Sequence, residues 1–243
     1  MKPTDRYIGP HVKWSSLIFA RLQAAAICLL LLLPFGARPA SAAPSSGPGT
    51  THVYLLRGVL NIFSLGLDDI ADKLRSQGIS VTVANFVLWS SLADDAAAGY
   101  KSGRLKTIIL VGHSSGATAL PDMVAKLGTL GVPVKLAIGL DSVFRTRLSG
   151  TANAERYINF YIASGAGEPV TRARDFRGKL ENVDVQSVPG VGHITIEKNQ
   201  IMQQKVIGAI DSVVFGRTIS PLSPTSTAVL HPDARAPAAT LRN

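Results

Sequence analysis

Apolar runs and segments of helical period alternate along the chain between residues 51 and 216. The segment TIILVGH over 107–113 is a continuous apolar run, which is typical of a central parallel strand covered on both faces. Over 65–77 the apolar residues instead recur at helical spacing, and Gly78 follows as a stop signal. This alternation predicts an α/β domain with a mostly parallel central sheet, right-handed crossovers and helices on both faces.

The pattern divides the domain into individual strands and helices. Pro121 is expected to disturb the early turns of the helix that follows the strand at 107–113. The predicted strands are 52–58, 79–86, 107–113, 134–141, 157–164 and, more weakly, 183–190, and the predicted helices are 65–77, 91–102, a third that ends near Leu130, and 197–215.

The first 42 residues have the features of an export signal. A basic stretch precedes the apolar run LQAAAICLLLLLPF at 22–35, and the small-residue site Ala40-Ser41-Ala42 follows. This order predicts a signal peptide over 1–42, and therefore a secreted or periplasmic protein. The apolar run is shorter than the ~20 residues that span a bilayer, so we expect no stable membrane span after signal removal. An uncleaved anchor that extends back to Leu17 is the alternative.

Composition separates the domain from its flanks. Residues 43–50 (APSSGPGT) read as a polar linker, and residues 217–243 are rich in Pro, Ser, Thr and Ala without a period, which predicts a disordered tail. A single α/β domain over 51–216 remains.

Charge and cysteine content narrow the function classes. The formal charge is +9, of which residues 43–243 carry +5, since five of the 25 Lys/Arg and one of the 16 Asp/Glu fall in the predicted signal. No Lys/Arg cluster points to nucleic acid, and we expect no such partner. The single cysteine, Cys28, lies within the predicted signal, which excludes a cysteine nucleophile or a Cys-ligated metal from the mature protein.

Gly112-His113-Ser114-Ser115-Gly116 matches the pattern G-x-S-x-G where the strand at 107–113 ends and a helix begins. A sharp strand-to-helix turn pushes the serine hydroxyl out above the sheet, and the flanking glycines leave room for that strained turn. The helix N-terminus adds free amides and a positive dipole end for developing negative charge. We predict Ser114 as a nucleophile; the alternative is a Gly/Ser loop that only joins strand to helix.

A serine nucleophile needs a neighbouring imidazole to take its proton. Of the five histidines, His11 lies in the predicted signal, His231 in the tail and His52 ahead of the nucleophile. The side chain of His113, inside the motif, should point away from the serine. His193 remains, in the loop VPGVGHITIEK after the last predicted strand, and the chain order Ser, acid, His favours it as the base. A loop histidine with a structural bond is the alternative.

The acid that orients the base is sought between the serine and the histidine. Asp141 ends the predicted strand VKLAIGL, and sites in parallel sheets lie at the carboxyl ends of strands. A carboxylate there can orient the imidazole and stabilise its charged form. Glu168, in the Gly-rich loop after the next strand, is the second candidate, and Asp141 could instead cap a helix.

An oxyanion hole would need two backbone amides. We predict those of Ser115, directly after the nucleophile, and of Val59, in the loop after the first strand. Gly58 allows a close approach of that loop to the serine. The residues predicted to bind substrate are Gly58, Leu60 and His113.

These motifs resemble the α/β-hydrolase superfamily, especially its small esterases, lipases and thioesterases, over about residues 52–215. GHSSG is the most specific element; GLDSV resembles the strand-ending Asp of lipases, and GHITIEK resembles the histidine loop of thioesterase-like members. The resemblance implies an α/β-hydrolase fold with a Ser-His-Asp triad. The sequence departs from the family at Arg57, where many members carry His before the glycine. Little sequence is left for a lid between Asp141 and Tyr157, so we expect a minimal lid.

The predicted activity is cleavage of a carboxylic ester or related acyl bond in a small-molecule or lipid substrate, with no cofactor and no metal. An acyl thioesterase is the alternative if the chain is not exported. Because a fold alone does not establish a function, a non-catalytic, envelope-associated binding module on the same fold is a further alternative.

Overall fold

The structure, a computed structural model, describes residues 47–59 and 64–216. The predicted signal peptide, residues 43–46 of the linker, the predicted tail and Leu60 lie outside the described residues. Among the described residues, no helix is long and apolar enough to cross a membrane.

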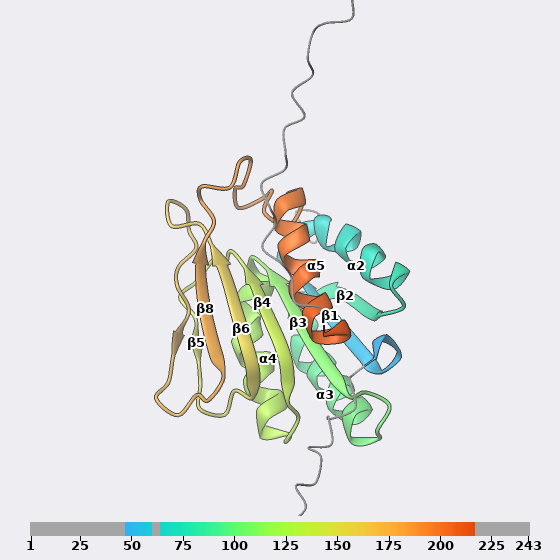
Figure 1. Ribbon diagram of the computed structural model, residues 1–243. Coiled ribbons are helices and arrows are strands. Elements are labelled where there is room, and N and C mark those ends of the chain that lie inside the picture. Colours follow the sequence, from blue (N-terminus) through green and yellow to red (C-terminus); the bar gives the residue numbers. More distant parts are fainter. Residues whose placement is uncertain (1–46, 60–63, 217–243) are drawn as a thin grey trace, which may run out of the picture. The chain divides into compact units, whose positions relative to one another are not determined.

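A six-stranded parallel sheet forms the centre of the molecule, with the strand order β2-β1-β3-β4-β6-β8 (Figure 1). All seven residues of β3 are buried, as the continuous apolar run predicts for a central strand. The strands are β1 (Thr51–Arg57), β2 (Ser80–Asn85), β3 (Thr107–His113), β4 (Val134–Leu140), β6 (Ala154–Tyr161) and β8 (Lys179–Asp184).

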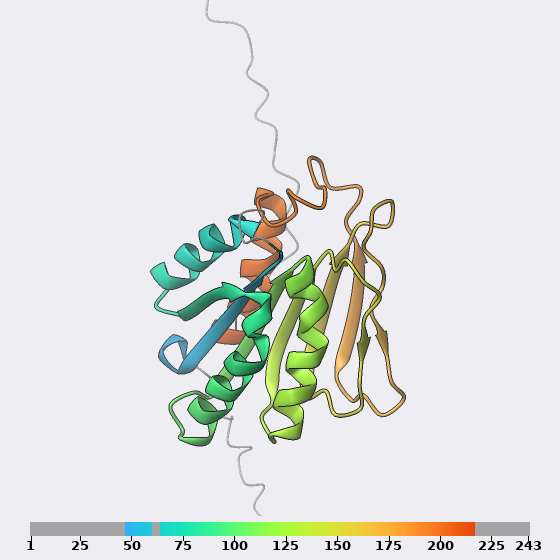
Figure 2. The ribbon, with the colours of Figure 1, turned by 180° about the vertical axis from the view of Figure 1, so that it is seen from behind.

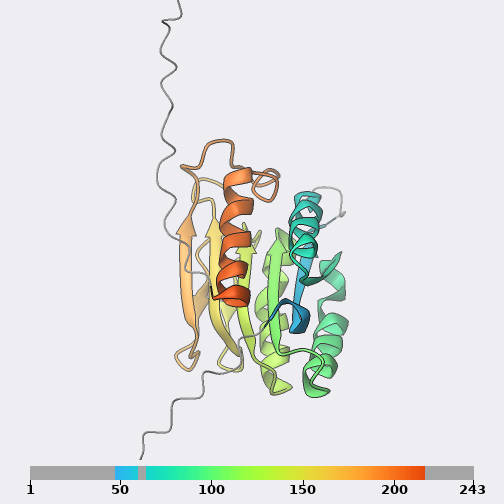
Figure 3. The same ribbon diagram turned by 45° about the vertical axis from the view of Figure 1, so that its right-hand side comes forward.

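Helices cover both faces of this sheet. Helices α2 (Gly66–Ser76) and α5 (Gln200–Phe215) pack on one face (Figures 1 and 3), and α3 (Trp89–Lys101) and α4 (Ser115–Thr129) pack on the other (Figure 2). Each face buries its own cluster of apolar side chains, and burial of that surface is the main favourable term in folding. The predicted fold class, a mostly parallel sheet with helices on both faces, is confirmed.

Smaller elements complete the described chain. Two 3₁₀ turns, η1 (Pro48–Thr50) and η3 (Phe86–Leu88), precede β1 and α3. The short strands β5 (Arg147–Leu148) and β7 (Thr171–Arg172) pair in parallel as a separate two-stranded sheet, which the sequence analysis did not predict.

The weakest predicted strand, 183–190, is wrong in position. The strand lies at Lys179–Asp184, and turns follow it. Among the described strands it is an edge strand that pairs with β6 alone, and it is largely exposed, so its mixed polar sequence carries little apolar signal. The apolar Val185 and Val188 instead pack from the following turns against the cluster beneath α5.

Other boundaries differ by a few residues. Strand β6 begins three residues before the predicted 157–164, and α5 begins at Gln200 instead of 197. The start of α5 is fixed by Asn199, whose side-chain oxygen accepts hydrogen bonds from the backbone N–H groups of Ile201 and Met202. Helix α4 continues through Pro121.

Candidate active site

Ser114 lies at the turn between β3 and α4, with φ 59° and ψ −123°. Positive φ is unusual for a residue with a side chain, and such strain persists only where the surroundings impose it. Here the Ser114 N–H donates to the carbonyl oxygen of Leu140, 3.0 Å away, which ties the turn to the neighbouring strand β4.

The two glycines of the motif are required by close backbone packing. A Cβ atom on Gly112 would lie 2.5 Å from the carbonyl carbon of Gly116, and one on Gly116 would lie 2.0 Å from the carbonyl oxygen of Leu56 in β1. A Cβ on Gly58 would lie 2.9 Å from the Cβ of Ser114. The turn and the loop after β1 therefore pass against each other with no room for side chains.

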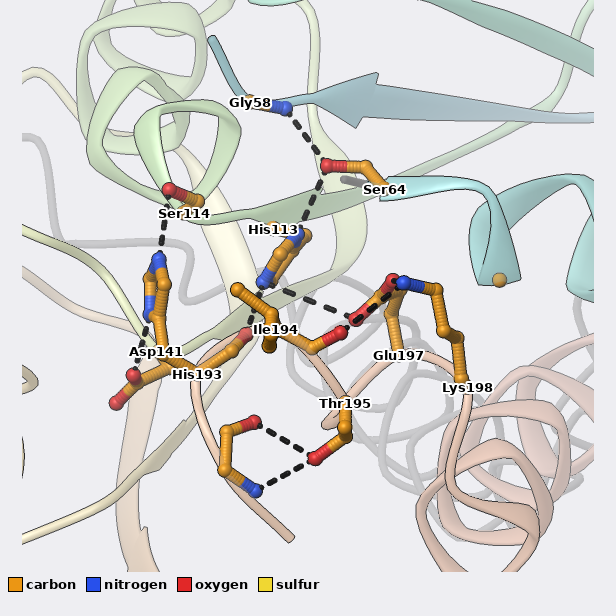
Figure 4. A network of polar contacts seen from close by, with 12 residues as sticks. Gly58, Ser64, His113, Ser114, Asp141, His193, Ile194, Thr195, Glu197 and Lys198 are labelled. Atoms are coloured by element: carbon orange, nitrogen blue, oxygen red, sulfur yellow. Dashed lines mark hydrogen bonds and ion pairs between the residues drawn. The ribbon is translucent and has the colours of Figure 1, made fainter. Parts of the chain in front are cut away.

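Three of the predicted residues come together at the carboxyl edge of the sheet (Figure 4). His193 Nε2 lies 3.1 Å from Ser114 Oγ, and His193 Nδ1 lies 2.7 Å from Asp141 Oδ2. Because a carboxylate only accepts, Nδ1 carries the proton, and the Nε2 lone pair faces the serine hydroxyl. The His193 side chain is 35% exposed, whereas that of Asp141 is fully buried.

Asp141 is held rigidly at the end of β4. Its backbone has φ 48°, its N–H donates to Phe160 O, and its Oδ1 accepts the Ile162 N–H at 3.0 Å. A Cβ on Gly167 would lie 1.9 Å from that Oδ1, so the loop after β6 closes over the carboxylate. One oxygen is thus satisfied by backbone, and the other is left for His193.

Glu168, the second candidate for the acid, lies apart from the histidine. Its carboxylate forms an ion pair with the exposed side chain of Arg145, with Oε2 2.6 Å from Nε. Arg57, the other uncertain position, pairs with Asp68 in the first turn of α2. Glu168 thus has an exposed partner, whereas Arg57 has a partly buried one.

A pocket of about 190 Å³ opens beside the serine hydroxyl. Val59, one predicted oxyanion donor, lines it, while Ser115, the other, is the first residue of α4, where N–H groups have no acceptor within the helix. The predicted substrate residues Gly58 and His113 line it as well, and Leu60 lies outside the described residues. Its full lining among described residues is Gly58, Val59, Ser64, His113, Ser114, His193 and Ile194.

The side chain of His113 is directed away from Ser114 Oγ and is 1% exposed. Its Nδ1 bonds Ser64 Oγ at 2.8 Å, and its Nε2 donates to the backbone oxygen of His193, also at 2.8 Å. Burial lowers the pKa of His113 to about 4, so the ring is neutral at ordinary pH.

Two buried polar residues near the site were missed by the sequence analysis. Ser64 connects His113 to the loop after β1, and Glu197 is fully buried with a carboxylate oxygen 3.9 Å from His113 Nε2. Burial raises the pKa of Glu197, which favours its neutral form. Glu197 stands in the quoted segment GHITIEK, but neither that pattern nor any around Ser64 indicates a contact with His113, so only the folded chain reveals it.

No family model matches the chain, and no curated protein matches it in sequence. Among solved structures it is similar to a candidate hydrolase of the α/β superfamily from Xanthomonas campestris pv. campestris, with 15% identity and a TM-score of 0.41 over 66% of this chain and 98% of that one. A gene product of Listeria innocua has 13% identity and a TM-score of 0.43 over 70% and 95% of the two chains. A protein of unknown function from Agrobacterium tumefaciens has 16% identity and a TM-score of 0.41 over 70% and 94%.

Likenesses at this level carry no argument about function, so the fold assignment rests on the architecture itself. A parallel sheet has helices on both faces, and a strained serine stands at the turn between a central strand and its helix. The chain has an α/β-hydrolase fold. Within this hydrolase fold, no group of three or more His, Cys, Asp or Glu side chains among the described residues is arranged to hold a metal ion.

Proposed function

We propose that the protein is an exported serine hydrolase that cleaves a carboxylic ester or a related acyl bond. The observation that carries the proposal is the continuous hydrogen-bonded series from Asp141 through His193 to Ser114. Serine is a weak nucleophile unless a positioned base takes its proton, and the base in turn needs an orienting partner. Contacts at one edge of the sheet support both conditions.

In the proposed reaction, Ser114 Oγ attacks the acyl carbon while His193 Nε2 takes its proton. The imidazolium that forms is stabilised by the buried Asp141 carboxylate, which stays ionised. His193 then gives the proton to the leaving alcohol, and an acyl-enzyme remains on Ser114. Water activated by the same histidine hydrolyses that ester and restores the free serine.

Negative charge develops on the acyl oxygen in each tetrahedral intermediate, and two backbone N–H groups would stabilise it. The Gly58 N–H cannot serve, because it donates to Ser64 Oγ at 3.1 Å. This leaves the next amide along the loop, that of Val59, which lines the pocket beside Ser114. The Ser115 N–H, at the start of α4, supplies the second donor and the positive end of the helix dipole.

The pocket favours small acyl groups. A volume of about 190 Å³, bounded by Val59 and Ile194, suits a short apolar chain. Short esters such as 4-nitrophenyl acetate and butyrate are therefore the first substrates to test.

The test is labelling of the purified protein by a fluorophosphonate probe, which reacts with activated serines. Wild type should be labelled, and Ser114→Ala and His193→Ala should not. Ser212→Ala is the matched control, because it removes a hydroxyl that bonds Ala209 O on α5 and should label like wild type. A folded wild-type protein that resists labelling would refute the hydrolase proposal and favour the non-catalytic binding module.

A further inference from the structure

A buried series of hydrogen bonds runs behind the nucleophile, separate from the one that contains Asp141. The Gly58 N–H donates to Ser64 Oγ at 3.1 Å, Ser64 Oγ bonds His113 Nδ1 at 2.8 Å, and His113 Nε2 bonds His193 O at 2.8 Å. Figure 4 shows these residues side by side, with the His113 ring between Ser64 and the backbone of His193. Ser64 and His113 are each 1% exposed, so water does not compete for these bonds.

Each group in this series has a single possible role. The His193 carbonyl oxygen can only accept, so His113 Nε2 carries the ring proton. The ring is neutral, which makes Nδ1 an acceptor, and the Ser64 hydroxyl must donate to it. A Ser64 lone pair is then free to accept the Gly58 N–H. The series therefore runs in one direction, from the loop after β1 to the loop that carries the base.

The two ends of the series are the two loops that must be placed against Ser114. Gly58 directly precedes the amide assigned to the oxyanion hole, and His193 carries the base. We propose that Ser64 and His113 are positioning residues, which hold the Val59 amide and the His193 ring at fixed positions on either side of Ser114. This inference rests on the proposed function, because an oxyanion amide and a base matter only in a hydrolase.

The expected effect follows from how steeply acyl transfer depends on geometry. Loss of one oxyanion donor lowers kcat by about 10² to 10³ in serine hydrolases, and a displacement of about 1 Å costs about 10². Removing the Ser64 hydroxyl frees the Gly58 peptide without deleting the Val59 N–H. We therefore expect a loss of about 10- to 100-fold.

Glu197 is not part of the series. Its carboxylate lies 3.9 Å from His113 Nε2, beyond hydrogen-bond distance, and the nearest cation is Lys198 Nζ at 3.4 Å. The positioning role is thus assigned to Ser64 and His113 alone.

The test compares wild type with Ser64→Ala, Ser64→Cys and the distant control Ser212→Ala, with 4-nitrophenyl acetate as substrate. Competent sites are counted by complete reaction with a fluorophosphonate, so kcat is expressed per titrated serine and misfolded protein does not contribute. We expect kcat per site to fall about 10- to 100-fold in Ser64→Ala, with KM within about twofold of wild type. Ser64→Cys keeps a side chain of similar size with a weak donor, so its kcat per site should lie between those of wild type and Ser64→Ala.

Inhibition by phenylboronic acid gives a second readout. Its tetrahedral serine adduct places an oxygen in the oxyanion hole, so its Ki should rise in Ser64→Ala by the same factor as kcat/KM falls. A purely structural role would lower the number of titrated sites and leave kcat per site and Ki unchanged. That result, in a wild type that labels normally, overturns the inference and leaves the proposed function intact.

A double-mutant cycle tests the connection between the two residues. His113→Phe keeps a ring but removes both polar nitrogen atoms. If Ser64 and His113 act as one series, the double variant should be no slower per site than His113→Phe alone. Losses that multiply would show that the two residues act independently, which contradicts the proposal.

Discussion

Two histidines lie beside Ser114 with ring centroids 5.3 Å apart, and their surroundings differ completely. His113 is enclosed by the core, with both ring nitrogens bonded to Ser64 and to backbone. His193 stands on a loop, with one nitrogen on a buried carboxylate and the other on a serine hydroxyl that faces a pocket. Both lie close to Ser114, so proximity alone does not distinguish them.

The difference shows what makes an imidazole a base. His113 has no lone pair directed at a reacting group, and burial keeps it from gaining a charge. His193 has such a lone pair, and Asp141 stabilises the charge that it would gain. Hydrogen-bond partners and access to the pocket therefore determine the role of each ring.

The largest expected effect is a difference in kcat between variants of the two histidines. His193→Ala should lower kcat by about 10⁶, as loss of the base does in serine hydrolases. The substitution keeps the backbone oxygen that His113 uses. His113→Phe should lower kcat per titrated site only about 10- to 100-fold, because it disturbs positions and not proton transfer. Steady-state hydrolysis of 4-nitrophenyl acetate measures both, and equal losses would remove the distinction.

The second-largest effect concerns the Asp141 carboxylate, a partner that His193 has and His113 lacks. Asp141→Asn should lower kcat by about 10⁴, since an amide stabilises the wrong tautomer of the ring. Asparagine tolerates the positive φ of this position, so the fold should persist. Glu168→Gln is the control: its carboxylate bonds exposed Arg145, and hydrolysis should stay within about twofold of wild type. A Glu168→Gln variant that loses activity while Asp141→Asn keeps it would reverse the assignment of the acid.

The smallest effect is a pH dependence of stability from His113. Its pKa is lowered in the folded protein from 6.5 to about 4, so the unfolded chain takes up this proton first as the pH falls. The contribution of the neutral His113 ring to the free energy of unfolding is complete above pH 6.5. It is lost as the pH falls towards 4, and the total loss is about 3 kcal/mol. Urea unfolding at pH 7.5 and 4.5 should show a smaller loss in His113→Phe than in wild type.

Glu197 acts in the opposite direction in that experiment. Its pKa is raised, so its contribution favours the folded state at low pH and is lost as the pH rises. Both proteins contain Glu197, so the difference between them isolates His113. An equal pH dependence in the two proteins would mean that His113 titrates normally in the fold.

The sheet and the main site residues could be predicted because they follow from local patterns and one rule of topology. The apolar run of β3 marks a central strand, and the glycines around Ser114 mark a turn with no room for side chains. Carboxyl ends of parallel strands share an edge, which predicts that Asp141 lies near Ser114. His193 was predicted by elimination among the five histidines and by the chain order Ser, acid, His. In the structure, the His193 ring contacts both Ser114 Oγ and Asp141 Oδ2.

The role of Ser64 and the position of β8 could not be predicted, because both depend on contacts between residues far apart in the sequence. Ser64 bonds a histidine 49 positions away, through a loop conformation that no motif specifies. Strand β8 was misplaced because its residues are selected by exposure at a sheet edge, while the apolar residues beyond it pack from turns. In both cases the tertiary environment, and not the local period, determines the residue type.

The backbone contacts around the nucleophile have a consequence for how the chain can diverge. Substitutions at Gly112 and Gly116 would drive a Cβ into main-chain atoms that cannot yield, whatever residue occupies position 114. A library selected only for soluble expression should therefore lose variants at these glycines while accepting Ser114→Ala freely. A descendant with another residue in place of Ser114 would still carry both glycines. The backbone packing of the fold requires the two glycines of G-x-S-x-G, whereas only the proposed hydrolysis requires the serine between them.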